Sequence, residues 1–150
     1  MSLYDWLLFL HVLSAFAVVA GLVLVTAAIL LSLRPGPDPS FAVSLTRFSP
    51  LLFDAAGLAI LVFGVWLAIE VDTYQVWDGW IIAALVLWVV IAGAGARALG
   101  AFRRARRTTE TTQPTDLATA VRSSRAPLWN AVAVVATLAT LVLMIWKPGA

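Results

Sequence analysis

Four separate segments of this chain are long and apolar enough to cross a lipid bilayer, and this pattern constrains the fold more than any other. A transmembrane helix needs ~20 mainly apolar residues to cross a hydrocarbon core of roughly 30 Å. The segments cover approximately residues 4–33, 50–69, 80–99 and 127–146. We therefore predict an all-α polytopic membrane protein, in which residues 1–150 form one four-helix transmembrane bundle.

The amino-acid composition excludes a water-soluble enzyme. Hydrophobic residues make up 62% of the chain and charged residues 12%, about half the charged share of soluble domains. Cysteine is absent, which excludes disulfides, cysteine–zinc sites and iron–sulfur clusters. The first segment contains Asp5 but no base at its start, and it exceeds the ~7–15 residues of a signal-peptide core. We expect it to be retained as a transmembrane helix.

The basic residues predict the orientation of the bundle, because cytoplasmic loops are enriched in Lys and Arg. Nine of the ten bases lie in or beside the first and third loops, residues 34–49 and 100–126, and only Lys147 lies on the other side. Both termini are therefore predicted to lie outside the cytoplasm. Five tryptophans are predicted to form an interfacial belt at the outer helix ends, namely Trp6, Trp66, Trp77, Trp80 and Trp146.

The two basic loops are also predicted to contact the membrane surface. Phe41, Leu45 and Phe48 recur at helical spacing, which predicts a short helix lying on the membrane. Each base near an anionic surface contributes ~1 kcal/mol of attraction, so we expect lipid head groups or a partner protein at the arginine cluster. No aromatic residues alternate with these arginines, and nucleic-acid binding is not expected. The cluster consists of Arg103, Arg104, Arg106 and Arg107.

Small and polar residues recur along one face of three segments, and such faces pack together in membranes. The third segment has only a weak pattern of this kind, at Ala92, Ala96 and Gly100. The three predicted seams are His11, Ser14, Val18, Gly21, Val25 and Ala28; Asp54, Gly57, Leu61, Gly64 and Ala68; and Asn130, Ala133, Thr137, Thr140 and Met144.

Three polar residues are each predicted to lie about one turn inside the cytoplasmic end of a helix: Asp54, Arg97 and Asn130. Because a charge inside the membrane is costly, we expect these side chains to form a buried polar latch. The alternative hypothesis makes Asp54 a proton or cation site. Replacing Asp54 with asparagine separates the two, because a latch variant loses thermal stability whereas a transport variant loses turnover.

His11 is the only histidine, and its seam position predicts that it lies inside the bundle at a depth near Thr140 and Met144. Imidazole can ligate a metal or haem iron, and methionine can serve as the second haem ligand. The competing interpretation is a packing residue that is hydrogen-bonded to a threonine or a backbone carbonyl. No second histidine and no catalytic constellation accompany it, so neither a metal site nor catalytic residues are predicted.

Short motifs of this chain resemble a family of bacterial membrane proteins. Leu-His-Val-Leu-Ser-Ala at 10–15 and Val-Ala-Gly-Leu at 19–22 resemble the opening of the domain of unknown function 2269 family of predicted integral membrane proteins. The stretch 56–67 and Trp-Asp-Gly-Trp-Ile at 77–81 resemble the second and third helices of that family. The resemblance implies a location in the bacterial cytoplasmic (inner) membrane and carries no assigned activity.

The first helix is also similar to those of the copper resistance protein D family and of the membrane protoporphyrinogen oxidase family. In the oxidase, a histidine of the first helix and a lysine of the third are implicated with haem. His11 matches that histidine, whereas the third segment here contains no lysine. Only one residue of the implied haem pair therefore has a counterpart.

Three function hypotheses follow from these features. The leading one is a small non-enzymatic bundle that self-associates or serves as an accessory subunit of a larger membrane complex, with no cofactor. The second is a haem- or metal-binding membrane redox protein that uses His11. The third is a small transporter that uses Asp54. A visible absorption spectrum of the purified protein discriminates the second hypothesis from the others.

Overall fold

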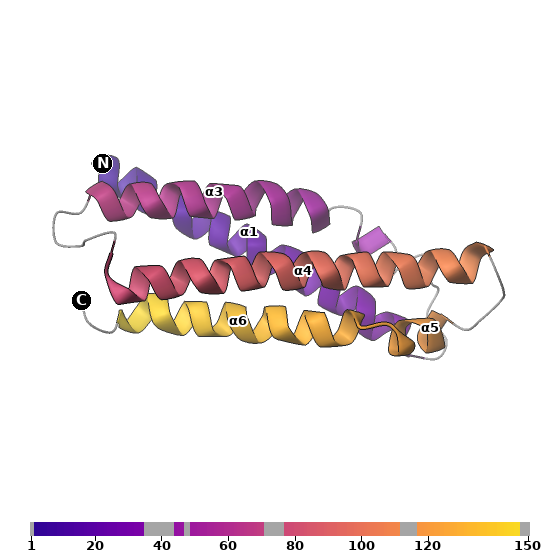
Figure 1. The fold of residues 1–150 in the computed structure, drawn as a ribbon. Coiled ribbons are helices and arrows are strands. Elements are labelled where there is room, and N and C mark those ends of the chain that lie inside the picture. Colours follow the sequence, from indigo (N-terminus) through magenta and orange to yellow (C-terminus); the bar gives the residue numbers. More distant parts are fainter. Residues whose placement is uncertain (1, 35–43, 47–48, 71–76, 112–116, 148–150) are drawn as a thin grey trace.

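A computed structural model describes residues 2–34, 44–46, 49–70, 77–111 and 117–147 of the chain (Figure 1). Within this part the structure is helical and contains no strand. Four of its helices are long and apolar enough to span a membrane, which confirms the predicted all-α architecture with four spans. The helices are α1 (Leu3–Ser32), α3 (Ser49–Glu70), α4 (Gly79–Thr111), α5 (Leu117–Ser123) and α6 (Ala126–Trp146).

Local signals account for the ends of the outer helices. The backbone amide of Ser2 donates a 2.8 Å hydrogen bond to Oδ2 of Asp5, and the amide of Asp5 donates one of 3.3 Å to Ser2 Oγ. This reciprocal capping satisfies two amides at the start of α1. Helix α6 carries a proline in its first turn, where a missing amide proton costs nothing. It ends at Lys147, whose φ of 39° is left-handed.

The four spans pack as two hairpins. Helix α1 packs mainly against α3, and α4 packs mainly against α6, whereas α3 and α4 barely touch. Helix α1 crosses behind the other spans at an angle and contacts α6 and α4 as well (Figure 1). Helix α1 begins at the same end of the molecule at which α6 ends (Figure 1). The gap between α3 and α4 is therefore a sparsely packed seam between the two hairpins.

Helix α4 corrects one sequence prediction, because it runs to Thr111 instead of ending near residue 99. The predicted loop 100–126 also contains helix α5. The reason is amphipathicity beyond the apolar span. Phe102 and Ala105 lie on one face and are buried with Val121 of α5, while Arg103 and Arg107 lie on the other face and are exposed.

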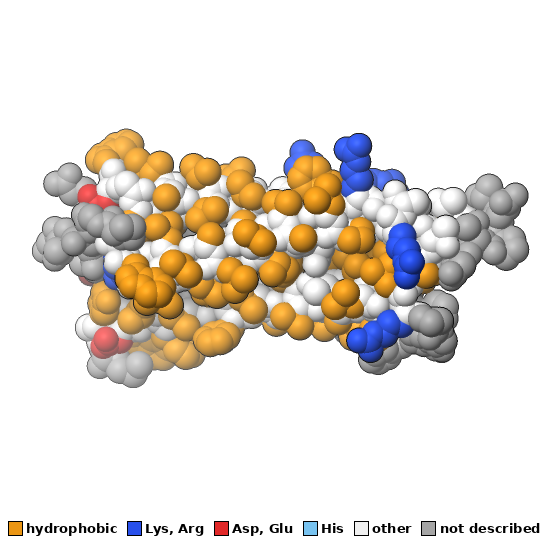
Figure 2. All heavy atoms as spheres, turned by 90° about the horizontal axis from the view of Figure 1, so that it is seen from below, with side chains coloured by type: hydrophobic (Ala, Val, Ile, Leu, Met, Phe, Trp, Pro, Cys, Tyr) orange, Lys and Arg blue, Asp and Glu red, His pale blue; other side chains and the backbone are white. Residues whose placement is uncertain are grey.

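The surface divides into an apolar middle and two polar ends (Figure 2). Hydrophobic side chains cover the middle of the molecule, as expected of helices that face lipid. Arginine side chains gather at the end near α5, and acidic side chains lie at the opposite end (Figure 2). We call these the basic end and the acidic end. The predicted surface helix around Phe41 and Phe48 falls largely outside the described residues.

Candidate functional site

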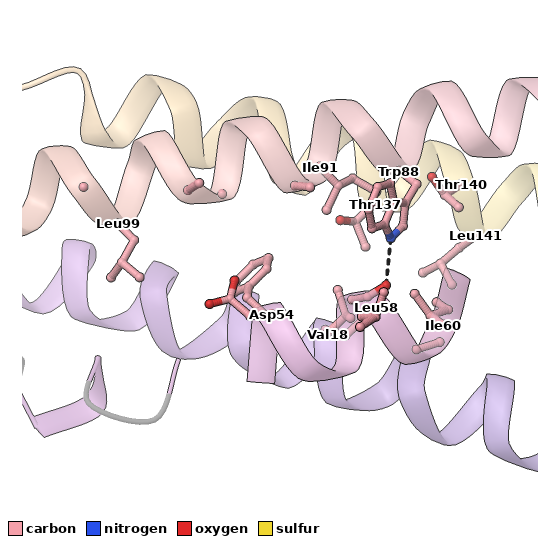
Figure 3. A pocket seen from close by; sticks show the side chains of 18 of the residues that line it. Val18, Asp54, Leu58, Ile60, Trp88, Ile91, Leu99, Thr137, Thr140 and Leu141 are labelled. Carbon is pink, nitrogen blue, oxygen red and sulfur yellow. Dashed lines mark hydrogen bonds between the residues drawn. The ribbon is translucent and has the colours of Figure 1, made fainter. Parts of the chain in front are cut away.

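A cavity with a volume of about 490 Å³ lies between the two hairpins. Helices α3 and α4 form its walls, and residues of α1 and α6 such as Val18 and Thr137 form its floor (Figure 3). Leu58 of its α3 wall is 61% exposed, so the cavity opens sideways through the gap between α3 and α4. We call it the lateral cavity. Its volume lies within the ~300–1,000 Å³ of small-molecule sites.

Small residues of α4 create much of this space. Ala92, Gly95, Ala96 and Gly100 line the wall, and they recur every three or four residues along one helical face. This is the weak small-residue pattern that the sequence predicted as a packing seam. In the structure Ala92 and Ala96 are exposed, so this stripe borders the open cavity and is not filled by a neighbouring helix.

Trp88 lines the cavity and links its two walls. Its indole nitrogen, on α4, donates a 3.1 Å hydrogen bond to the backbone carbonyl of Gly57 on α3 (Figure 3). Gly57 is buried, and it has nothing within 4 Å of the place where a Cβ atom would be. The bond joins the two hairpins across the sparsely packed seam between α3 and α4. No sequence pattern singled out Trp88, because its role depends on which helix stands opposite.

Two charged residues line the cavity, Asp54 of α3 and Arg103 of α4. Asp54 lies near the middle of the cavity, and Arg103 lies at the end of its α4 wall. The Asp54 carboxylate points toward the part of the cavity where Leu99 lies, which is the side of the basic end (Figure 3). Both side chains are exposed. Within the described part of the chain, neither makes a hydrogen bond or an ion pair. The remaining described side chains of the lining are uncharged.

The predicted polar latch is not formed, because its three residues have separate surroundings. Asn130 is buried, and its Nδ2 donates a 3.0 Å hydrogen bond to Oγ1 of Thr26 on α1. Arg97 is exposed, and its guanidinium carbon lies 5.1 Å from the ring centre of Trp129 on α6. Its Nη1 also lies 3.5 Å from the carbonyl oxygen of Gly93. Asp54 therefore lines the lateral cavity without contact to either of the other two residues.

His11 packs between α1 and α3. Its Nδ1 lies 3.0 Å from the carbonyl oxygen of Ile60, and since a carbonyl can only accept, Nδ1 carries the proton in this bond. A Cβ atom on Gly64 would approach His11 Cε1 to 2.8 Å, so this glycine makes room for the ring. This geometry is the backbone-bonded packing arrangement that the sequence left open as one of two interpretations.

The surroundings of His11 do not fit a haem. The cavity beside the ring has a volume of about 70 Å³ and is lined by apolar residues, among them Leu61, Ile81 and Leu85. Met144 does not line it and packs instead against the cluster that contains Trp80. Within the described residues, no group of three or more His, Cys, Asp or Glu side chains could hold a metal ion. The space beside the His11 ring is therefore too small for a haem.

The arginine cluster of the sequence is divided between two surfaces. Arg103 lines the lateral cavity, whereas Arg104 lines a second cavity of about 490 Å³ beside α5. Arg106 is partly buried, and Arg107 is exposed. The second cavity also takes in Arg97 and Arg125. Proximity in sequence therefore did not predict which arginines act together.

The fold and the cavities define a polytopic α-helical protein of the membrane. The family model described as "Predicted integral membrane protein (DUF2269)" matches residues 5–148, and the chain belongs to this family. The resemblance predicted from the short motifs is thereby confirmed. No curated protein and no solved structure matches the chain.

Proposed function

We propose that this protein is a non-enzymatic binding protein for single-chain amphiphiles of the membrane. The apolar chain lies in the lateral cavity, and a basic head group meets the Asp54 carboxylate. One observation carries the proposal: Asp54 is a charged side chain without a partner among the described residues, in a cavity that is otherwise largely apolar.

The length and the opening of the cavity support an extended chain as the ligand. Its α4 wall extends from Trp88 to Arg103, which at 1.5 Å per residue is about 22 Å. Asp54 lies near the level of Gly95, and the wall from there to Trp88 is about 10 Å long. One leaflet contributes half of a hydrocarbon core of roughly 30 Å, so the cavity holds the part of a lipid chain next to the head group, and the rest of the chain leaves through the gap. Because the gap faces the bilayer sideways, a chain can enter without crossing water.

The position of Asp54 supports a basic head group. A carboxylate inside the membrane costs up to ~2.5–3.5 kcal/mol at mid-depth and less near an interface, and a bound ammonium offsets that cost. Asp54 lies at the level of Gly95 on α4, because the ring of its neighbour Phe53 is 3.0 Å from where a Cβ atom on Gly95 would be. Arg103 lies two turns further along α4, toward the basic end. Asp54 is therefore deeper than Arg103. A ligand whose ammonium group is attached directly to its apolar chain would place that ammonium at Asp54. A phosphate at the same position would be repelled by the Asp54 carboxylate.

The orientation that we propose follows the positive-inside tendency. The basic end faces the cytoplasm of a bacterial cell, the protein lies in its cytoplasmic membrane, and both termini face outward. The arginines at this end then lie at the anionic inner surface, where each contributes ~1 kcal/mol of attraction. The separation of the charges between the two ends supports this arrangement (Figure 2).

The test compares three spin-labelled probes that share one stearyl chain and differ in the head group: an amine, an alcohol and a carboxylic acid. The fraction of motionally restricted probe is measured by electron paramagnetic resonance with the protein in nanodiscs. We expect the amine to bind on the order of tenfold more tightly than the alcohol, as one charge-assisted hydrogen bond gives. In Asp54→Asn this preference disappears while the binding of the alcohol remains.

Cavity-filling variants supply the second arm of the test. Ala92→Trp and Ala96→Trp should abolish binding of all three probes, because both alanines line the lateral cavity. Val89→Trp is the matched control, since Val89 is 62% exposed on the same helix and does not line the cavity. Equal binding by Ala92→Trp and the wild type overturns the proposal. If the probes fail to bind because a second membrane protein co-purifies and occupies the cavity, the result would instead favour an accessory subunit of a larger membrane complex.

A further inference from the structure

The second cavity brings together three arginines that are distant in sequence. Arg97 and Arg104 lie on α4, and Arg125 lies directly before α6. All three side chains are exposed and line the same space of about 490 Å³. None of the described residues that line it is acidic. A concave surface of this kind concentrates positive potential and attracts an anion.

Two of these arginines have guanidinium groups without a partner among the described residues, whereas the third, Arg97, is held by Trp129 and by a 3.5 Å hydrogen bond from its Nη1 to the Gly93 carbonyl. Within the described part of the chain, Arg104 and Arg125 make no hydrogen bond or ion pair through their guanidinium groups. The ring centre of Trp129 lies 5.1 Å from the guanidinium carbon of Arg97. Stacking on an aromatic ring leaves the edge of a guanidinium available for hydrogen bonds. One arginine of the set is therefore already oriented before any ligand arrives.

Hydroxyl groups also border the cavity, but their protons are already donated, so the arginines supply the donors for a ligand. Thr108, Ser123 and Ser124 border the cavity, and each donates its own proton to a backbone carbonyl of its helix or turn. Guanidinium groups recognise phosphate by paired N–H donors. The chemistry of the cavity is therefore that of a phosphate site, and it is independent of the lateral cavity and of the function proposed for it.

The place of the cavity in the fold selects the source of the phosphate. It lies where the apolar span of α4 passes into its arginine-rich extension, beside Trp129, and tryptophan rings gather at the level of lipid head groups. Leu128, next to Trp129, is 60% exposed and offers an apolar surface to lipid chains. We propose that Arg97, Arg104 and Arg125 form a binding site for the phosphate group of an anionic phospholipid.

The experiment measures retention of spin-labelled phosphatidylglycerol by the full-length protein in phosphatidylcholine nanodiscs, against spin-labelled phosphatidylcholine. We expect preferential restriction of phosphatidylglycerol in the wild type. Each of Arg97→Gln, Arg104→Gln and Arg125→Gln should reduce that preference on the order of fivefold, as the loss of one interfacial base implies. Arg122→Gln is the matched control, because Arg122 is exposed on α5 and does not line the cavity.

The two other outcomes overturn the proposal. An equal loss of preference in Arg122→Gln and Arg104→Gln would show diffuse attraction to the surface and no discrete site. Competition by millimolar inorganic phosphate as effective as that by unlabelled phosphatidylglycerol would assign the site to a soluble phosphate compound. Because Arg97 also packs on Trp129, the thermal unfolding of Arg97→Gln in detergent serves as the check that the bundle is intact.

Discussion

The indole nitrogen of Trp88 and the backbone carbonyl oxygen of Gly57 are 3.1 Å apart and join α4 to α3. Few other contacts bridge these two helices. The bond therefore links the two walls of the lateral cavity and limits how far the two hairpins can separate. It makes Trp88 a structural determinant of the cavity.

Trp88→Phe should loosen the seam between α3 and α4 and leave each hairpin intact. Interhelical hydrogen bonds in membranes contribute on average ~0.6 kcal/mol, and at most ~1.7 kcal/mol, to stability, so only a small drop in the unfolding temperature is expected. The chain lacks cysteine, and spin labels can be placed at Val62→Cys and Val89→Cys. Double electron–electron resonance should then show a longer and broader distribution of the distance between the two labels in Trp88→Phe than in the protein with Trp88. An unchanged distribution would contradict the role assigned to Trp88.

Gly64→Ala should destabilise the hairpin of α1 and α3. The new Cβ would come within 2.8 Å of His11 Cε1, and overpacking of this kind typically costs ~1–3 kcal/mol. Gly57→Ala is the control, because nothing lies within 4 Å of its new Cβ. In thermal unfolding in detergent, the double variant His11→Ala with Gly64→Ala should recover most of the loss. If Gly64→Ala unfolds like the wild type, the close packing of the ring is refuted.

Asp54→Asn should leave the thermal stability unchanged or raise it, because the carboxylate has no partner among the described residues and its removal relieves the cost of a charge inside the membrane. The latch hypothesis requires the opposite result, because it gives Asp54 a stabilising role. Thermal unfolding of the purified variant decides between them. A large loss of stability would show that Asp54 has a structural partner.

Asn130 and Thr26 should show measurable coupling in a double-mutant cycle with Asn130→Ala and Thr26→Val. Their hydrogen bond of 3.0 Å joins α6 to α1, and a coupling of about 0.6 kcal/mol is expected inside a membrane. Thr26 Oγ1 also donates to the carbonyl of Leu22 at 2.8 Å, so the Thr26 variant removes two bonds and the cycle is needed to isolate one. Additive effects of the two variants would exclude the coupling.

Labelling of single cysteines tests the proposed orientation. Ser2→Cys lies before α1 and Ser123→Cys lies at the end of α5, and both positions are exposed. A membrane-impermeant maleimide applied to intact cells should label Ser2→Cys alone, and permeabilised cells should allow labelling of both. Labelling of Ser123→Cys in intact cells would reverse the orientation of the bundle.

The spans and several packing faces could be predicted from the sequence, because each depends on residues of one helix. Ser14, Gly21 and Val25 of the first predicted seam are buried, as are Asn130 and Ala133 of the last. Membrane thickness fixes the length of a span, and small residues mark where helices approach. Neither signal depends on the order of the helices around the bundle.

The polar latch and the two cavities depend on that order. Asp54 and Arg97 lie at similar distances from the predicted cytoplasmic ends of their helices. They do not meet, because α3 packs mainly on α1 whereas Arg97 lies over Trp129 of α6. The extension of α4 has a different cause. An arginine-rich stretch looks like a loop by hydropathy, yet its alanines and Phe102 bury one helical face against α5.

The pairing of the four spans into two hairpins has a consequence for biosynthesis. Each hairpin contains most of its own helix–helix contacts, so it can enter the bilayer and assemble before the other is made. A chain divided between Glu70 and Trp77 would therefore yield two halves that reassemble when produced together in one cell. The two halves would then rejoin along the gap between α3 and α4, which is also the opening through which a lipid chain is proposed to enter the lateral cavity.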